Sequence, residues 1–167
     1  ASKNLKAIVV RGKTPLAIAD PKKLAEMAKW GAKELPNNPD MAGIAELGTA
    51  CVVIPQNDLG TLPSYNYNEA YYEGAKKLSG ETMAETILKK RETCYSCVVR
   101  CKRVVEGEYL DNKIDPYYGG PEYETLGTFG SMCGIDNLEA VALMNQVCNS
   151  YGVDTIACGA TIAFAIE

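Results

Sequence analysis

Histidine is missing from this sequence of 167 residues. Without an imidazole, a metal site built from this chain alone has to use thiolate, carboxylate or carbonyl ligands. Long apolar runs are missing too, because none approaches the 18 or so residues that a membrane-spanning helix needs. The first four residues do not resemble the apolar core of a signal peptide. We therefore expect a cytoplasmic protein with no membrane partner.

Clustered positive charge is also scarce. The 17 basic residues are interspersed among 21 acidic ones, for a formal net charge of -4 and a pI near 5.0. Nucleic acids are bound through grouped lysines and arginines, so we expect no nucleic-acid partner. The apolar fraction of 47% is ordinary for a globular protein, and the length allows one domain with a core.

The sequence predicts a mainly α fold, a multihelical domain preceded by a short strand. Leu5–Gly12 is β-branched and closed by glycine, which is typical of a strand and fits the last strand of an N-terminal sheet domain. The first and last residues lack start and stop signals, so we expect a longer enzyme. We expect an extended run at 51–54, a loop at 57–67, and helices over residues 20–35, 41–47, 69–78, 79–91, 123–132, 136–151 and 154–167.

Helix caps support several of these boundaries. Asp20 is placed to cap the first helix with Pro21 at its first position. Asp136, with a glutamate three residues later, has the pattern of a capping box for the helix that Gly152 ends. Asp154 is placed to cap the last helix.

Cysteine is the residue that this sequence has in excess. There are seven, and in an acidic chain expected in the cytoplasm they indicate metal or redox chemistry before disulfides. Cys94, Cys97 and Cys101 have the spacing C-x2-C-x3-C, which brings three thiolates into one small volume, as the irons of a cubane cluster require. The fourth ligand would be one of the other cysteines or a residue beyond 167. The other cysteines are Cys51, Cys133, Cys148 and Cys158.

Two other interpretations of the cysteine motif stay open. Zinc would usually take a second C-x2-C pair, which the sequence does not contain, and a disulfide would leave one of the three cysteines unpaired. Arg100, Lys102 and Arg103 lie beside the motif, where cations lower thiol pKa values, although they would serve equally as a solvated face.

Several short blocks of the sequence, in the same order along the chain, resemble the tungsten-containing aldehyde ferredoxin oxidoreductases. These enzymes bind tungsten through a bis-pterin cofactor. The GPEYET block at 120–125, followed by GIDNLEA at 134–140, is the most specific part of the resemblance. The resemblance implies that residues 1–12 end an N-terminal cofactor-binding β domain. It implies that residues 13–167 form a helical domain with the cluster cysteines and one pterin-binding motif. The remaining blocks are SKNLKAI at 2–8, GTLP at 60–63, the cysteine motif and GVDTI at 152–156.

By this resemblance Cys94, Cys97 and Cys101 bind a 4Fe-4S cluster, whose fourth cysteine lies far downstream. The other four cysteines are then expected to be small core residues. The family's D-x-x-G-L-[DC] pterin motif corresponds to residues 149–154 here, which makes Asn149, Gly152, Val153 and Asp154 cofactor contacts. Glycine permits a tight helix exit, and Asp154 offers a carboxylate acceptor as well as a helix cap. Asn149 replaces the usual aspartate and removes a charge.

The resemblance also assigns a catalytic carboxylate. Glu124 matches a glutamate near the metal, where burial would raise its pKa and let it shuttle a proton; Glu122 is the second choice. From the residues alone, Glu124 would be a helix-start residue stabilised by the dipole. Leu143 and Gln146 stand where some members carry an E-x-x-H pair that binds one iron between subunits, so we expect no such iron.

The expected activity is oxidation of aldehydes to carboxylic acids at a tungsten or molybdenum bis-pterin centre. Electrons would pass through the 4Fe-4S cluster to ferredoxin or another redox subunit, in a homo-oligomer or a larger complex. The cofactor carries the difficult chemistry and the protein positions it. Three alternatives are the catalytic subunit of a tungsten benzoyl-CoA reductase, a non-enzymatic iron–sulfur electron-transfer domain, and a zinc-binding helical module.

Overall fold

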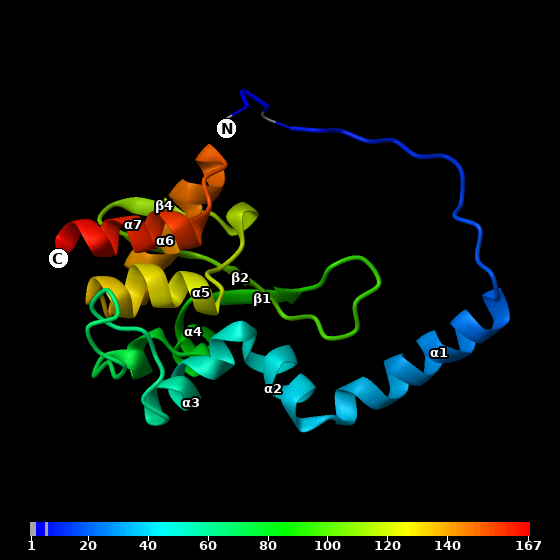
Figure 1. Ribbon diagram of the computed structural model, residues 1–167, viewed down its shortest axis with the longest axis horizontal. Coiled ribbons are helices and arrows are strands. Elements are labelled where there is room, and N and C mark those ends of the chain that lie inside the picture. The colour runs from blue at the N-terminus through cyan, green and yellow to red at the C-terminus, as the bar shows by residue number, and fades with distance from the viewer. Residues whose placement is uncertain (1–2, 6) are drawn as a thin grey trace.

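The computed structural model describes residues 3–5 and 7–167, which form seven α-helices and two antiparallel sheets of two strands each (Figure 1). The mainly helical fold expected from the sequence is therefore confirmed. No helix in this part of the chain is long and apolar enough to cross a membrane. The helices are α1 (Pro21–Glu34), α2 (Pro39–Leu47), α3 (Val53–Asp58), α4 (Gly80–Thr86), α5 (Tyr123–Thr125), α6 (Leu138–Tyr151) and α7 (Thr155–Ile166), and the strands are β1 (Leu88–Glu92), β2 (Lys102–Val105), β3 (Gly107–Tyr109) and β4 (Asn112–Ile114).

The core lies between the helices of the second half of the chain and the segments α3 and α4. A π-helical turn, Leu126–Gly130, follows α5 and is buried at every residue. α7 packs across this turn, and Gly159 is the contact point, because a Cβ there would lie 2.6 Å from the Thr128 hydroxyl. Figure 1 shows the turn, in yellow, between α7 and the segments α3 and α4. The largest fully buried side chains include Phe129, Leu62, Leu78, Met83, Ile114, Leu126, Val53, Val105 and Val141.

α1 and residues 7–20 stand away from this core. α1 has no buried residue, and the preceding segment runs back over the body as an extended arm (Figure 1). Asp20 caps α1 as expected, since its Oδ1 accepts a hydrogen bond of 2.9 Å from the backbone N–H of Lys23. The helix that the sequence predicts over 20–35 is confirmed.

The strand predicted at 5–12 is wrong for Leu5 and residues 7–12, which have no regular secondary structure; Lys6 lies outside the described residues. A strand is stabilised by hydrogen bonds to a neighbouring strand. None of the described residues pairs with this segment. A β-branched composition is not sufficient to form a strand without such a partner.

The helix predicted over 79–91 is also partly wrong. Ser79 caps α4 as expected, with its hydroxyl accepting from Thr82 N at 3.2 Å, but the helix ends at Thr86. Leu88–Glu92 forms β1, which pairs with β2 in antiparallel register. The valines of β2, Val104 and Val105, are buried, so the sheet gains apolar burial that a longer exposed helix would lack.

Two predictions in the first half of the chain also fail. The run 51–54, expected to be extended, is a 3-10 turn that continues into α3, since a short apolar run does not distinguish strand from helix. Pro55 is accommodated because it lies in the first turn of α3. The helix expected at 69–78 is reduced to a 3-10 turn at Ala75–Leu78. Residues 59–74 otherwise have no helix, which extends the predicted loop.

The end of the chain agrees more closely with the sequence. Asn137 caps α6, with its Oδ1 accepting from Ala140 N at 2.7 Å, so the cap lies one residue after the expected Asp136. Asp136 pairs instead with Lys77 at 2.5 Å. Gly152, at a φ of +67°, ends α6, and Asp154 caps α7 through a hydrogen bond of 2.6 Å to Ala157 N.

Candidate functional site

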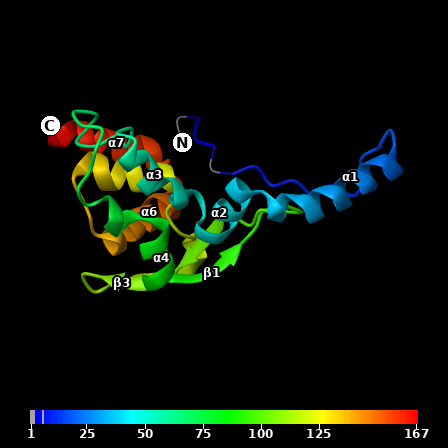
Figure 2. The same ribbon diagram turned by 90° about the horizontal axis from the view of Figure 1, so that it is seen from below.

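The three clustered cysteines lie on the loop between β1 and β2, which we call the cysteine loop (residues 93–101). The last paired residues, Glu92 and Lys102, are opposite each other in the sheet and hold the two ends of the loop together. The loop projects from the sheet in Figure 1. In Figure 2 the strands lie along the lower edge of the body and α7 along the upper edge.

The cysteine loop has an internal hydrogen-bond network at its N-terminal end. Cys97 N donates to Cys94 O at 3.1 Å, and the Thr93 hydroxyl donates to Cys97 O at 2.6 Å. Ser96 and Arg100 have φ angles of +55° and +60°, which turn the backbone twice within the loop. Left-handed conformations are uncommon at non-glycine positions, and here they bend the loop sharply.

The thiols of the loop are accessible to a ligand. Cys94 is exposed, whereas Cys97 and Cys101 are half-buried. Backbone N–H groups of Val99 and Arg100 donate hydrogen bonds that lower the pKa of the Cys97 thiol, against a smaller opposing effect of burial. Hydrogen bonds to sulfur stabilise the thiolate, which is the form that binds metal.

The three sulfurs do not meet at one point. In residues 3–5 and 7–167, no three cysteine, aspartate or glutamate side chains are close enough to hold a single metal ion. Zinc needs its donors around one ion, whereas a cubane cluster takes each thiolate on a different iron. The cluster and the zinc site expected as alternatives from the sequence therefore both stay predictions.

The remaining four cysteines lie outside the loop. Cys148 is buried in the core, Cys158 packs against the core, and Cys51 and Cys133 are half-buried. Burial, with a smaller contribution from the neighbouring Cys158, raises the pKa of the Cys148 thiol to about 11. Burial also raises the pKa values of Cys51 and Cys133. The thiols of Cys51, Cys133 and Cys148 are therefore poorly suited to ionise at neutral pH, in contrast to that of Cys97.

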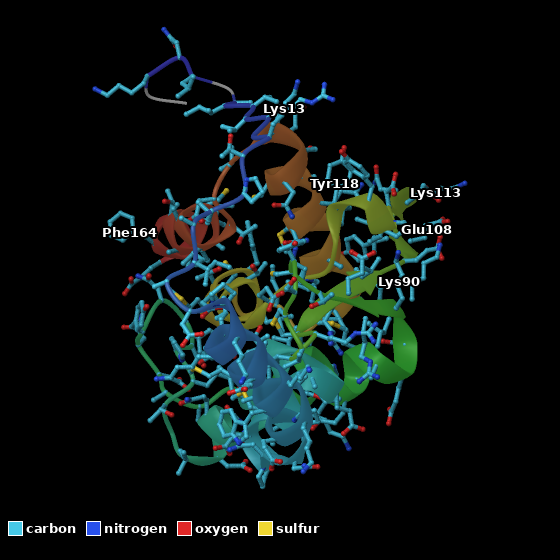
Figure 3. All side chains as sticks on the ribbon, turned by 90° about the vertical axis from the view of Figure 1, so that its right-hand side faces the viewer. Lys13, Lys90, Glu108, Lys113, Tyr118 and Phe164 are labelled. Atoms are coloured by element: carbon cyan, nitrogen blue, oxygen red, sulfur yellow. The ribbon has the colours of Figure 1, made fainter. Side chains whose placement is uncertain are left out.

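A polar groove lies next to the base of the cysteine loop. Its volume is about 430 Å³, and Arg103, Glu122 and Asn149 contribute to its lining together with the Gly119-Gly120 pair. Tyr118, also in the lining, is labelled in Figure 3 between α6 and the strands. The groove thus brings together Lys102 and Arg103 of β2, residues of the GGPEYET block (residues 119–125, the GPEYET block with Gly119 before it) and the first residue of the predicted pterin motif.

The predicted pterin motif forms the turn between α6 and α7. Asn149 lines the groove and donates to Tyr118 O at 3.2 Å. Gly152, Val153 and Asp154 are exposed on the turn itself, outside the groove lining. Val153 N donates to Cys148 O at 2.9 Å, which closes the end of α6 and fixes the path of the turn.

Glu124 is exposed at the start of α5, and its side chain does not line the groove. The next residue, Thr125, forms a hydrogen bond of 2.8 Å with Thr155, the residue after Asp154. This bond places the segment that carries Glu124 beside the turn that carries Asp154. Glu122, the second choice from the sequence, is half-buried and does line the groove.

Gln146 and Leu143, which stand where some family members are expected to carry an E-x-x-H pair, have other contacts. Gln146 accepts from Asp115 N at 2.6 Å and donates to Lys113 O at 3.0 Å, which joins α6 to the end of β4. Leu143 packs against the core. The expectation that no iron binds here stays a prediction.

Thr49 and the structural role of Arg103 were not predicted from the sequence. Thr49 contacts Glu122, and Arg103 contacts the backbone of α2 and of the cysteine loop. Each contact joins residues more than 50 positions apart or depends on the loop conformation. A single sequence contains no signal that would have revealed them.

Comparison with known proteins gives the same family as the resemblance seen in the sequence. Residues 26–167 match the family model described as aldehyde ferredoxin oxidoreductase, domains 2 and 3. The chain is 37% identical over 167 residues to the tungsten-containing aldehyde ferredoxin oxidoreductase of Pyrococcus abyssi, and 36% identical over 170 residues to that of Pyrococcus furiosus. An aliphatic sulfonate oxidoreductase, WOR-like subunit, of Pyrococcus furiosus is 29% identical over 172 residues. Each alignment covers 99% of this chain, but the chain spans only 26–27% of the length of these relatives.

Proposed function

The chain belongs to the aldehyde ferredoxin oxidoreductase family, within domains 2 and 3, and on this basis we propose that it is part of an enzyme that oxidises aldehydes to carboxylic acids. The proposed centre is a tungsten or molybdenum bis-pterin next to a 4Fe-4S cluster. Electrons leave through the cluster to ferredoxin or another redox subunit.

One observation carries this proposal beyond family membership. The polar groove lies between the base of the cysteine loop and Asn149 at the end of α6. Glu92 and Lys102, the residues on either side of the cysteine loop, line this groove together with Asn149, a predicted pterin contact 47 positions after Lys102. This arrangement supports the proposal that the two cofactors lie near each other.

We propose that Cys94, Cys97 and Cys101 are three of the four cluster ligands. Their loop is accessible, and hydrogen bonds to Cys97 favour its thiolate. The fourth ligand is proposed to come from elsewhere in the full-length protein, as the family resemblance implies. The cluster accepts and donates single electrons, which suits a one-electron partner such as ferredoxin.

We propose that Asn149, Gly152, Val153 and Asp154 contact a pterin. The amide of Asn149 and the carboxylate of Asp154 offer acceptors, and the tight turn at Gly152 exposes backbone groups of the same segment. Asp154 has a second task, because its Oδ2 already caps α7. Its other oxygen remains for a ligand N–H, since a carboxylate has two acceptor oxygens.

The reaction RCHO + H2O → RCOOH + 2 H⁺ + 2 e⁻ requires a proton acceptor. A bound tungsten or molybdenum centre would supply the acceptor for the two electrons, and the polypeptide would hold the substrate and move the protons. We propose that a carboxylate oxygen of Glu124 takes one of the two protons and that the other passes to water, since the segment that carries Glu124 lies beside the Asp154 turn and its side chain is exposed. The rest of the enzyme would cover this face and raise the pKa of Glu124 by excluding water.

Metal analysis of the full-length protein, purified without oxygen, tests the proposal. The expected result is about four irons and one tungsten or molybdenum per chain, a brown colour, and aldehyde-dependent reduction of a viologen dye. Replacing Glu124 with glutamine should abolish viologen reduction while both metals remain bound. A colourless protein that contains only zinc would contradict the proposal. A brown protein that fails to oxidise any aldehyde would contradict the proposed substrate class but would support the proposed cluster.

A further inference from the structure

The guanidinium of Arg103 connects α2 to the cysteine loop. It donates to Glu46 O at 2.6 Å and Ala45 O at 3.0 Å, both in the last turn of α2. It also donates to Arg100 O at 2.7 Å and Cys101 O at 3.2 Å, at the end of the cysteine loop. The residue is 3% exposed. One side chain therefore satisfies four backbone carbonyls from two separate segments.

The space around Arg103 is closed on two sides. Gly48 has a φ of +70°, and a Cβ at this position would lie 3.0 Å from both Arg103 Cγ and Cys101 O. On the other side, Gly120 N donates to Arg103 O at 2.9 Å. The arginine is thus held between the end of α2 and the GGPEYET block, with little room for another rotamer.

The choice of arginine has a physical reason. Its planar guanidinium carries five N–H donors in a fixed fork, whereas a lysine ammonium has three donors at one point. The last carbonyls of α2 lack partners within the helix and carry the negative end of its dipole, so a buried cation is favourable there. All four recorded acceptors are backbone carbonyls, which indicates that Arg103 orders the backbone.

We propose that Arg103 is a positioning residue for the iron–sulfur cluster. By fixing the carbonyls of Arg100 and Cys101, it sets the direction of the Cys101 thiolate, and it keeps a buried positive charge beside that ligand. This inference rests on the proposed cluster site. Reduction adds an electron to the cluster, so a nearby cation stabilises the reduced form and raises the reduction potential.

Two substitutions at Arg103 separate geometry from charge. Arg103→Gln removes both the fork and the charge, whereas Arg103→Lys keeps the charge and loses the fork. Arg91→Gln is the matched control, because Arg91 is an exposed neighbour that donates a single hydrogen bond of 3.0 Å to Ala45 O. All are made in the full-length protein. The readouts are iron content, the EPR spectrum of the reduced cluster, its midpoint potential, and the rate of iron release to a chelator.

The expected results differ among the three variants. Arg103→Gln should lower the midpoint potential, broaden the EPR spectrum and release iron several-fold faster than the unmodified protein. Arg103→Lys should restore most of the potential but still release iron faster, because the Cys101 end of the loop is no longer fixed. Arg91→Gln should match the unmodified protein in all four measurements.

Several outcomes would overturn the inference. One is that Arg103→Gln leaves potential, EPR spectrum and iron release unchanged. Another is that both Arg103 variants lose their helical circular dichroism while Arg91→Gln keeps it, since Arg103 would then serve the general fold. An unmodified protein without any cluster would instead refute the proposed function, so the two failures can be distinguished.

Discussion

The Thr49 hydroxyl donates a hydrogen bond of 2.5 Å to the Glu122 carboxylate, between residues 73 positions apart. The same hydroxyl oxygen accepts from Tyr123 N at 2.9 Å, at the start of α5. Thr49 therefore ties the segment after α2 to the block that lines the polar groove. It fixes both the carboxylate of Glu122 and the first free N–H of the following helix.

Replacing Thr49 with valine keeps the shape but removes both hydrogen bonds. We expect a loss of about 1–3 kcal/mol in the free energy of unfolding, because Glu122 and Tyr123 N lose a partner at a half-buried site. Thr49→Ser keeps the hydroxyl and should cost less than about 1 kcal/mol. Denaturant unfolding of the two variants checks this expectation. Equal stability of Thr49→Val and the unmodified protein would show that water replaces the threonine without cost.

The cysteine loop gives a prediction about iron. Cys97→Ala should reduce bound iron in the full-length protein to near zero, because a cubane that loses a thiolate ligand is labile. Cys133→Ala is the control, since Cys133 is half-buried and donates to Thr128 O at 3.2 Å, outside the loop. It should keep its iron. If Cys133→Ala loses iron as completely as Cys97→Ala, the fourth ligand is local and the chain forms an iron–sulfur domain by itself.

The contact between α7 and the π-helical turn gives a prediction about packing. Gly159→Ala should destabilise the protein by about 1–3 kcal/mol, because the new methyl group overlaps Thr128. Gly43→Ala, in the middle of α2, meets no atom within 4 Å and should stabilise by roughly 0.5–1 kcal/mol through helix propensity. Chemical denaturation measures both. The two substitutions are expected to change the free energy of unfolding in opposite directions. An unchanged stability of Gly159→Ala would contradict the close approach of α7 to the π-helical turn.

The pH dependence of thiol alkylation should distinguish the buried Cys148 from the exposed Cys94. With a pKa of about 11, Cys148 is almost entirely protonated at pH 8, and its thiolate fraction rises roughly tenfold for each pH unit below that pKa. In iron-free protein, alkylation at pH 8 should modify the exposed Cys94 rapidly and Cys148 slowly, with Cys148 accelerating as the pH rises. Mass spectrometry of the labelled peptides follows each site. Rapid labelling of Cys148 at pH 8 in folded protein would contradict its burial.

The parts of the fold that depend on neighbouring residues could be predicted from the sequence. Asp20, Gly152 and Asp154 act on backbone groups within about four positions, so their helix ends follow from local chemistry. β1 could not be predicted, because Leu88–Glu92 becomes a strand only through pairing with Lys102–Val105. The charges of Lys89, Lys90 and Arg91 suit a helix end equally well.

The candidate site likewise combines features that follow from local sequence with features that depend on tertiary packing. The cysteine motif is local and visible as a spacing, whereas the groove requires α6 to approach the strands. The four acceptors of Arg103 depend on the end of α2 lying beside Arg103, which is 58 positions after Ala45. The sequence therefore indicates which residues have suitable chemistry, and tertiary packing decides which of them meet.

The hairpin that carries the cysteine loop has a consequence for how the protein is made. A β-hairpin forms in about 1–10 μs, whereas a ribosome adds about 5–20 residues per second. Once Val105 has emerged, β1 and β2 can pair and present three thiols while synthesis continues for several seconds. If the fourth ligand comes from downstream, as the family resemblance implies, the nascent chain will present three thiols before the fourth has been synthesised. Cluster binding can then begin during translation and be completed only when the downstream residue has emerged.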